Sequence, residues 1–152
     1  ARYNADGNLV DWWTPEDLAK FKTKTKLIVD QYSKFKVGDK NVNGDATQGE
    51  NIADLGGLTM SYYAYKKSLA GAKSKTISGY TGEQRFFIAW AQGWKSMTRD
   101  AELKRLLTVD YHSPAYFRAF APLTNMKEFY EAFGVKEGDK MFVPETKRVE
   151  IW

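Results

Sequence analysis

Cysteine is absent from the 152-residue chain, and histidine occurs once, as His112. The lack of cysteine excludes disulfides and metal sites built from thiolates. No apolar run approaches the about 20 residues that a membrane-spanning helix needs. The formal net charge of +4 is too small to indicate nucleic-acid binding by itself. The chain starts with Ala1 and shows no signal-like segment, so we expect it to be processed or cut from a longer polypeptide.

The abundant residue types predict one packed domain that covers residues 1–152. Hydrophobic residues make up 43% of the chain and aromatic residues 15%, which is enough for a sizeable core. Their spacing predicts a mostly α fold with irregular loops. The expected helices are 15–35, 47–70, 83–97, 100–107, 114–120 and 125–133. Residues 38–46 and 71–82 are expected to form polar loops, and residues 134–152 to be irregular.

Local signals support the first of these helices. Thr14 is a good N-cap, and Pro15 suits the first helical position. Lysines alternate with other residues from Lys20 to Lys26, so a short strand is an alternative there. Lysines also alternate with aromatic residues, as in Lys20-Phe21-Lys22 and Tyr63-Ala64-Tyr65-Lys66-Lys67. Such a pattern is compatible with single-stranded nucleic acid, but a solvated helix edge explains it better.

The most informative segment is Gly49-Glu50-Asn51-Ile52-Ala53-Asp54-Leu55-Gly56-Gly57. On a helix, Glu50 and Asp54 share one face, one turn apart. Apolar and small neighbours predict that both acids are at least partly buried, which is costly unless a cation, a metal or hydrogen-bond donors meet them. The segment therefore predicts a positively charged partner opposite these two acids.

Glu50 has a structural alternative. Thr47 and Glu50 match a capping box at a helix N-terminus. Asp54 does not fit that explanation, because the helix dipole acts mainly within the first turn. Gly56 and Gly57 each cost about 1 kcal/mol against alanine inside a helix, which is tolerable where another helix approaches closely. The pattern then predicts a metal ligand at Glu50, a supporting acid at Asp54 and a close helix crossing.

His112 lies in the segment Asp110-Tyr111-His112-Ser113-Pro114, with Arg118 six residues further on. A lone histidine is most often structural, but a loop donor beside an arginine suits stabilisation of an oxyanion and binding of a substrate carbonyl. A triad of Ser113, His112 and Asp110 is disfavoured because residues so close in sequence do not easily direct their side chains at one another. We expect Ser113 to be the N-cap of the helix that follows Pro114.

Separated motifs along the chain then occur in a recognisable order. They are Asp6-Gly7-Asn8-Leu9-Val10-Asp11-Trp12-Trp13-Thr14, Asn43-Gly44-x-x-Thr47-x-Gly49-Glu50-Asn51-Ile52-Ala53-Asp54-x-Gly56-Gly57-Leu58, Phe86-Phe87-x-x-Trp90-Ala91-Gln92-x-Trp94, His112-Ser113-Pro114-x-x-x-Arg118, Asn125-x-x-x-Phe129-x-x-Ala132-Phe133, Met141 and Trp152. Together they resemble the neprilysin family of zinc metallopeptidases over essentially the whole chain. The resemblance implies the C-terminal part of a gluzincin-type catalytic domain.

The resemblance also implies a role for each matching residue. Glu50 would be the third zinc ligand, and Asp54 would hydrogen-bond a zinc-bound histidine and fix its orientation. His112 would stabilise the tetrahedral intermediate, and Arg118 would hold a substrate backbone carbonyl. The implied reaction is hydrolysis of peptide bonds, on the amino side of hydrophobic residues, by a zinc-activated water and a glutamate base.

Two departures from the family pattern matter. Its animal members carry cysteines about where Leu27, Lys95, Val135 and Val149 stand, which suggests a bacterial-type protein, periplasmic or secreted. The motif His-Glu-x-x-His is absent, because the chain has one histidine. We therefore expect zinc to be shared with two histidines outside this chain, on an upstream segment or a second chain, and the chain alone to be inactive. A catalytically dead relative and a peptide- or glycan-binding module are the rival interpretations.

Overall fold

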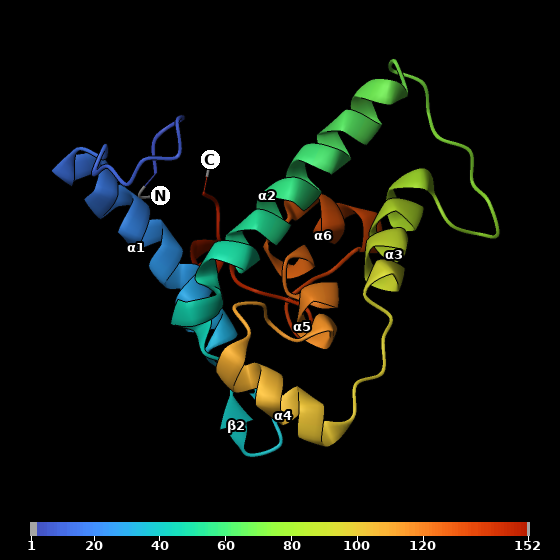
Figure 1. Cartoon of the computed structure of the whole chain (residues 1–152). Coiled ribbons are helices and arrows are strands. Elements are labelled where there is room, and N and C mark those ends of the chain that lie inside the picture. Colours follow the sequence, from blue (N-terminus) through green and yellow to red (C-terminus); the bar gives the residue numbers. More distant parts are fainter. Residues whose placement is uncertain (1–2, 152) are drawn as a thin grey trace.

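The computed structural model describes residues 3–151 and is mostly helical (Figure 1). The expectations for Ala1 and Trp152 lie outside the described residues. The elements are α1 (Pro15–Tyr32), β1 (Lys36–Val37), β2 (Lys40–Asn41), α2 (Gly44–Ser68), α3 (Gly82–Gly93), α4 (Asp100–Val109), α5 (Ala115–Phe120) and α6 (Lys127–Phe133), with two short 3-10 helices, η1 (Leu123–Asn125) and η2 (Glu145–Lys147). The prediction of a mostly α fold is confirmed.

Helix α1 forms as its capping signals predict, so the strand alternative is wrong. The Thr14 side chain accepts a hydrogen bond from the Asp17 amide, and proline occupies the first turn. The helix ends at Tyr32, and the chain then forms a two-stranded antiparallel hairpin, β1–β2. Part of this hairpin was expected to be loop. Strands of two residues are too short to show a period in the sequence, and Gly38, at φ +61°, makes the turn.

Helix α2 begins three residues earlier than predicted. Its N-cap is Asn43, whose side chain accepts a hydrogen bond from the Ala46 amide. Thr47 lies inside the helix and donates its hydroxyl to the Asn43 carbonyl. Gly44 marks a close approach of α1, because a side chain there would meet the Val29 carbonyl and the Ser33 hydroxyl. This approach fixes where α2 crosses α1.

The core lies between α1, α2, α3 and α6 and includes the segment that joins α5 to α6, with α6 behind α2 in Figure 1. Its most deeply buried large side chains include Tyr32, Leu58 and Phe87. Aromatic rings dominate the packing, as in the stacked pair Tyr62 and Phe87. These rings hold the C-terminal half of α2 against α3. Glu50 and Asp54 lie on the N-terminal half of α2.

Helix boundaries elsewhere differ from the predictions by a few residues. α3 stops at Gly93 rather than near residue 97, and α6 starts at Lys127 because η1 occupies 123–125. The segment after α6 is irregular as predicted, apart from η2. It is nevertheless held to the core: the Tyr130 hydroxyl accepts a hydrogen bond from the Val143 amide, and Asn125 accepts one from the Val149 amide.

Candidate active site

Glu50 and Asp54 lie on one face of α2, as their spacing predicts, but in different surroundings. The Asp54 side chain is 9% exposed, whereas the Glu50 side chain is 45% exposed. The capping-box alternative for Glu50 is wrong, because the helix begins at Gly44 and Glu50 lies in its second turn. The carboxylate of Glu50 is therefore not used by the helix N-terminus and faces the loop before α5.

Asp54 meets its positive partner within the chain. Arg118, on α5, donates to both carboxylate oxygens: Nε lies 2.7 Å from Oδ2 and a terminal nitrogen 2.8 Å from Oδ1. This bidentate bond raises the pKa of Arg118, which is charged throughout the ordinary range. The guanidinium also lies over the Trp94 ring, 3.9 Å from its centroid. The Trp90 indole fixes the backbone of α5 by donating to the Arg118 carbonyl at 3.1 Å.

The His112 ring lies between two carboxylates. Its Nε2 is 3.2 Å from a Glu50 oxygen, and its Nδ1 is 2.7 Å from Asp110 Oδ1. The same Asp110 oxygen accepts the His112 backbone amide at 2.9 Å. These bonds lower the pKa of Asp110. A nitrogen held in this way can present a hydrogen-bond donor to an oxygen atom that gains negative charge.

The contact between Asp110 and His112 shows that residues this close in sequence can direct their side chains at one another. A tight turn brings the two side chains together despite their closeness in sequence. A Ser113 triad remains disfavoured, because Ser113 donates its hydroxyl to Asn51 Oδ1 at 2.8 Å. Ser113 is also not an N-cap: Pro114 holds that position, and no described side chain caps α5.

Sequence reasoning missed the two polar and aromatic partners of this site, Asn51 and Trp94. Asn51 is completely buried and donates to the Thr47 hydroxyl at 3.0 Å. Its position beside Glu50 in an apolar segment was the available signal. Trp94 occurs in the sequence only as part of the Phe86-to-Trp94 motif, and nothing in the sequence connects it to Arg118.

A cavity of about 250 Å³ opens beside these residues. Its lining combines the polar groups of the site with an apolar wall from α4 and the end of α3. The residues that line it include Trp94, Leu103, Leu106, Asp110, His112 and Arg118. A cavity with one apolar wall and convergent donors suits an extended chain that has an apolar side chain and a backbone carbonyl.

The potential metal ligands do not form a complete site within residues 3–151, where no group of three or more histidine, cysteine, aspartate or glutamate side chains could hold a metal ion. Glu50 is the exposed carboxylate next to His112, whereas both oxygens of Asp54 accept from Arg118. The donor set fits one carboxylate ligand of a site shared with other residues, because a zinc site takes at least three protein ligands.

No other described element approaches closely at Gly57, whereas Gly56 is buried, so the close helix crossing at this pair stays a prediction. Gly57 is exposed, and a side chain placed there would have no described atom within 4 Å. Ala53, one turn earlier, is also exposed. This part of α2 therefore presents a surface of small residues directly beside Glu50.

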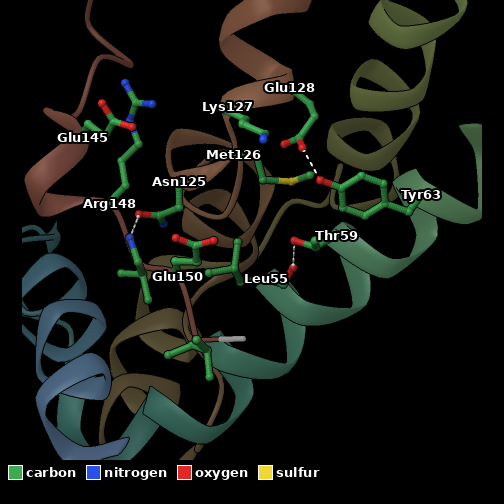
Figure 2. A pocket seen from close by; sticks show the side chains of 12 residues that line it. Leu55, Thr59, Tyr63, Asn125, Met126, Lys127, Glu128, Glu145, Arg148 and Glu150 are labelled. Atoms are coloured by element: carbon green, nitrogen blue, oxygen red, sulfur yellow. Dashed lines mark hydrogen bonds between the residues drawn. The ribbon is translucent and has the colours of Figure 1, made fainter. Parts of the chain in front are cut away.

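A second cavity, of about 330 Å³, lies between the C-terminal half of α2, the start of α6 and the C-terminal segment (Figure 2). None of Glu50, Asp54, His112 and Arg118 lines it. Figure 2 shows Tyr63 directed at Glu128, to which it donates its hydroxyl at 2.6 Å. Arg148 is held over the Tyr130 ring. This cavity is thus separate from the candidate active site.

Comparison with known proteins gives relatives along the whole chain. Residues 1–149 match peptidase family M13. The chain is 39% identical to an endothelin-converting enzyme homolog of Locusta migratoria and 40% identical to human endothelin-converting enzyme 1, in each case over 99% of the chain. It spans only 21% and 20% of the length of these two relatives.

Solved structures agree with the fold. The zinc metalloprotease Zmp1 of Mycobacterium tuberculosis, in complex with an inhibitor, superposes with a TM-score of 0.94 at 44% identity, over 99% of this chain and 24% of that one. PepO from Lactobacillus rhamnosis gives 0.83 at 32% identity, over 100% and 23%. Each helix within residues 3–151 is too short or too polar to cross a membrane. The chain belongs to peptidase family M13, the neprilysin family of zinc metallopeptidases.

Proposed function

We propose that this chain is the C-terminal segment of a zinc metalloendopeptidase and supplies one metal ligand and two substrate-binding residues. One observation carries the proposal: Glu50 and Asp54, one turn apart on α2, are paired with His112 and Arg118 respectively. His112 and Arg118 also line one cavity, so each of the two donors lies between a carboxylate of α2 and that cavity. Membership of family M13 supports this assignment, and the activity of the whole protein is part of the proposal.

Each side chain has a role that follows from its surroundings. The Glu50 carboxylate is half exposed and does not cap α2, so it can bind a metal ion. Bound zinc would act as a Lewis acid that activates water. His112, oriented by Asp110, donates to the oxygen of the substrate carbonyl as charge develops there. Arg118 keeps one guanidinium face on Trp94 and two nitrogens on Asp54, which fixes its position for binding a substrate carbonyl.

The remaining ligands belong to the proposal as well. We infer that an upstream segment carrying His-Glu-x-x-His packs on the exposed small residues of α2 near Ala53 and Gly57, where a helix can approach closely. A zinc-bound histidine there would lie near Asp54. On this basis the 152-residue chain alone binds zinc weakly and is inactive. An extracytoplasmic location is also proposed, and cell fractionation tests it.

The decisive experiment replaces Glu50 by glutamine in the complete protein that contains this chain. Glu50→Gln keeps the shape and removes the ligand charge, so bound zinc and peptide hydrolysis should fall together. Glu102→Gln, which changes an exposed carboxylate on α4, is the matched control and should change neither. Zinc is measured by metal analysis and activity with a peptide substrate.

Two outcomes would contradict the proposal. Loss of hydrolysis in Glu50→Gln with zinc fully retained would show that Glu50 is not a ligand. A complete protein that holds zinc but cleaves no peptide, or that holds no zinc, would instead favour a catalytically dead relative or a peptide-binding module.

A further inference from the structure

We propose that Ser113 and Asn51 form a buried link that positions His112 relative to Glu50. This inference rests on the proposed function, in which Glu50 is a metal ligand and His112 binds the reacting carbonyl oxygen. Ser113 directly follows His112, and Asn51 directly follows Glu50. A bond between the two neighbours therefore fixes the loop before α5 to the ligand-bearing turn of α2.

The contacts of this link are short and enclosed. The Ser113 hydroxyl donates to Asn51 Oδ1 at 2.8 Å, and the Asn51 amide donates to the Thr47 hydroxyl at 3.0 Å. Thr47 in turn donates to the Asn43 carbonyl at 2.9 Å. Ser113 is 3% exposed, Asn51 0% and Thr47 4%. The chain of bonds thus runs from the His112 loop through three buried side chains to the N-cap of α2.

A buried polar chain at this position needs a reason other than stability. Burial of polar groups is tolerated only when they are hydrogen-bonded, and an apolar pair of the same shape can stabilise a protein equally well. Ser113 does not cap α5, so helix capping does not explain it. The hydrogen bond between Ser113 and Asn51 fixes where the loop before α5 lies along α2. Apolar packing alone would not select this one position, because it has no preferred direction.

Ser113 and Asp110 constrain different degrees of freedom of His112. Asp110 accepts from the ring Nδ1 and from the backbone amide of His112, so it sets the rotation of the ring within the loop. Asp110 has no bond to α2 among the described contacts. Ser113 attaches the loop itself to α2. The distance of 3.2 Å between His112 and Glu50 depends on that attachment.

The test is Ser113→Ala in the complete protein. We expect turnover to fall by about 10-fold to 100-fold, the range for small misplacement of a group in an active site. Bound zinc should stay within about twofold, and turnover should fall by a larger factor than KM rises, because the Ser113 hydroxyl is bonded to Asn51, although Ser113 lines the cavity beside His112. Thr124→Ala is the matched control. Thr124 is also buried and accepts a hydrogen bond from the Gln31 side chain, but it lies away from the site. The turnover of the Thr124→Ala variant should therefore equal that of the unmodified protein.

A double variant separates positioning from general damage. If Ser113 acts through His112, then Ser113→Ala should cause no further loss of turnover in a His112→Phe background, whereas general damage would cause the same loss in both backgrounds. Ser113→Cys preserves size but is a weak donor, and it should lower turnover in the same way if the alanine variant does not fold.

Normal turnover in Ser113→Cys, or additive losses in the double variant, would overturn the positioning role. The failure of the proposed function looks different. In that case the complete protein hydrolyses no peptide, or His112→Phe alone leaves turnover unchanged.

Discussion

Replacement of Arg118 by methionine tests the energetics of the buried ion pair. Arg118 and Asp54 have side chains that are 16% and 9% exposed, and two bonds of 2.7 and 2.8 Å join them. Methionine retains the packing against Trp94 but leaves the Asp54 carboxylate without its cation. Breaking a buried pair in this way costs about 3–5 kcal/mol. Since Arg118 is not fully enclosed, we expect the lower end, about 3 kcal/mol, or roughly a 100-fold change in the unfolding equilibrium constant.

The measurement is the urea midpoint of the complete protein, followed by tryptophan fluorescence. Arg105→Met is a close control, because Arg105 binds Glu102 through two bonds of 2.8 Å but in an exposed pair on α4. Its midpoint should not change measurably, since exposed pairs contribute little. Adding Asp54→Asn to Arg118→Met should recover part of the loss by removing the buried charge. Equal midpoints for both arginine variants, or no recovery in the double variant, would refute this reasoning.

Three further predictions concern function and pH. His112→Phe should keep zinc bound and change KM little but lower turnover by about 100-fold or more, the cost of one oxyanion donor; loss of zinc in a metal analysis would contradict this role. Asp54→Asn should weaken zinc binding by about 10–100-fold, as measured by competition with a chelator, with activity falling in parallel. Asp110 has a lowered pKa, so it stabilises the fold above the ordinary carboxyl pKa, and this contribution is lost as the pH falls through the lowered value. Asp110→Asn should therefore reduce the melting temperature near pH 7 and match the unmodified protein in strong acid.

Much of the fold follows from local sequence signals. Thr14 and Pro15 specify the start of α1, and the spacing of apolar residues predicts most helices, because capping and periodicity act within a few residues. Boundaries failed where two signals competed. Asn43 and Thr47 can both cap a helix; in the structure Asn43 is the N-cap, and α1 approaches α2 closely at its first residue, Gly44.

For the candidate site, too, the sequence predicts local features, and the tertiary structure decides the long-range contacts. The sequence by itself determined that Glu50 and Asp54 share a helix face and need positive partners, since burial of a carboxylate has that cost wherever it occurs. It could not specify the partners, because 64 residues separate Asp54 from Arg118 and 62 separate Asn51 from Ser113. Only the tertiary structure, by packing α5 and its preceding loop against α2, decided that Arg118 meets Asp54, that His112 meets Glu50, and that Ser113 serves the loop rather than a helix end.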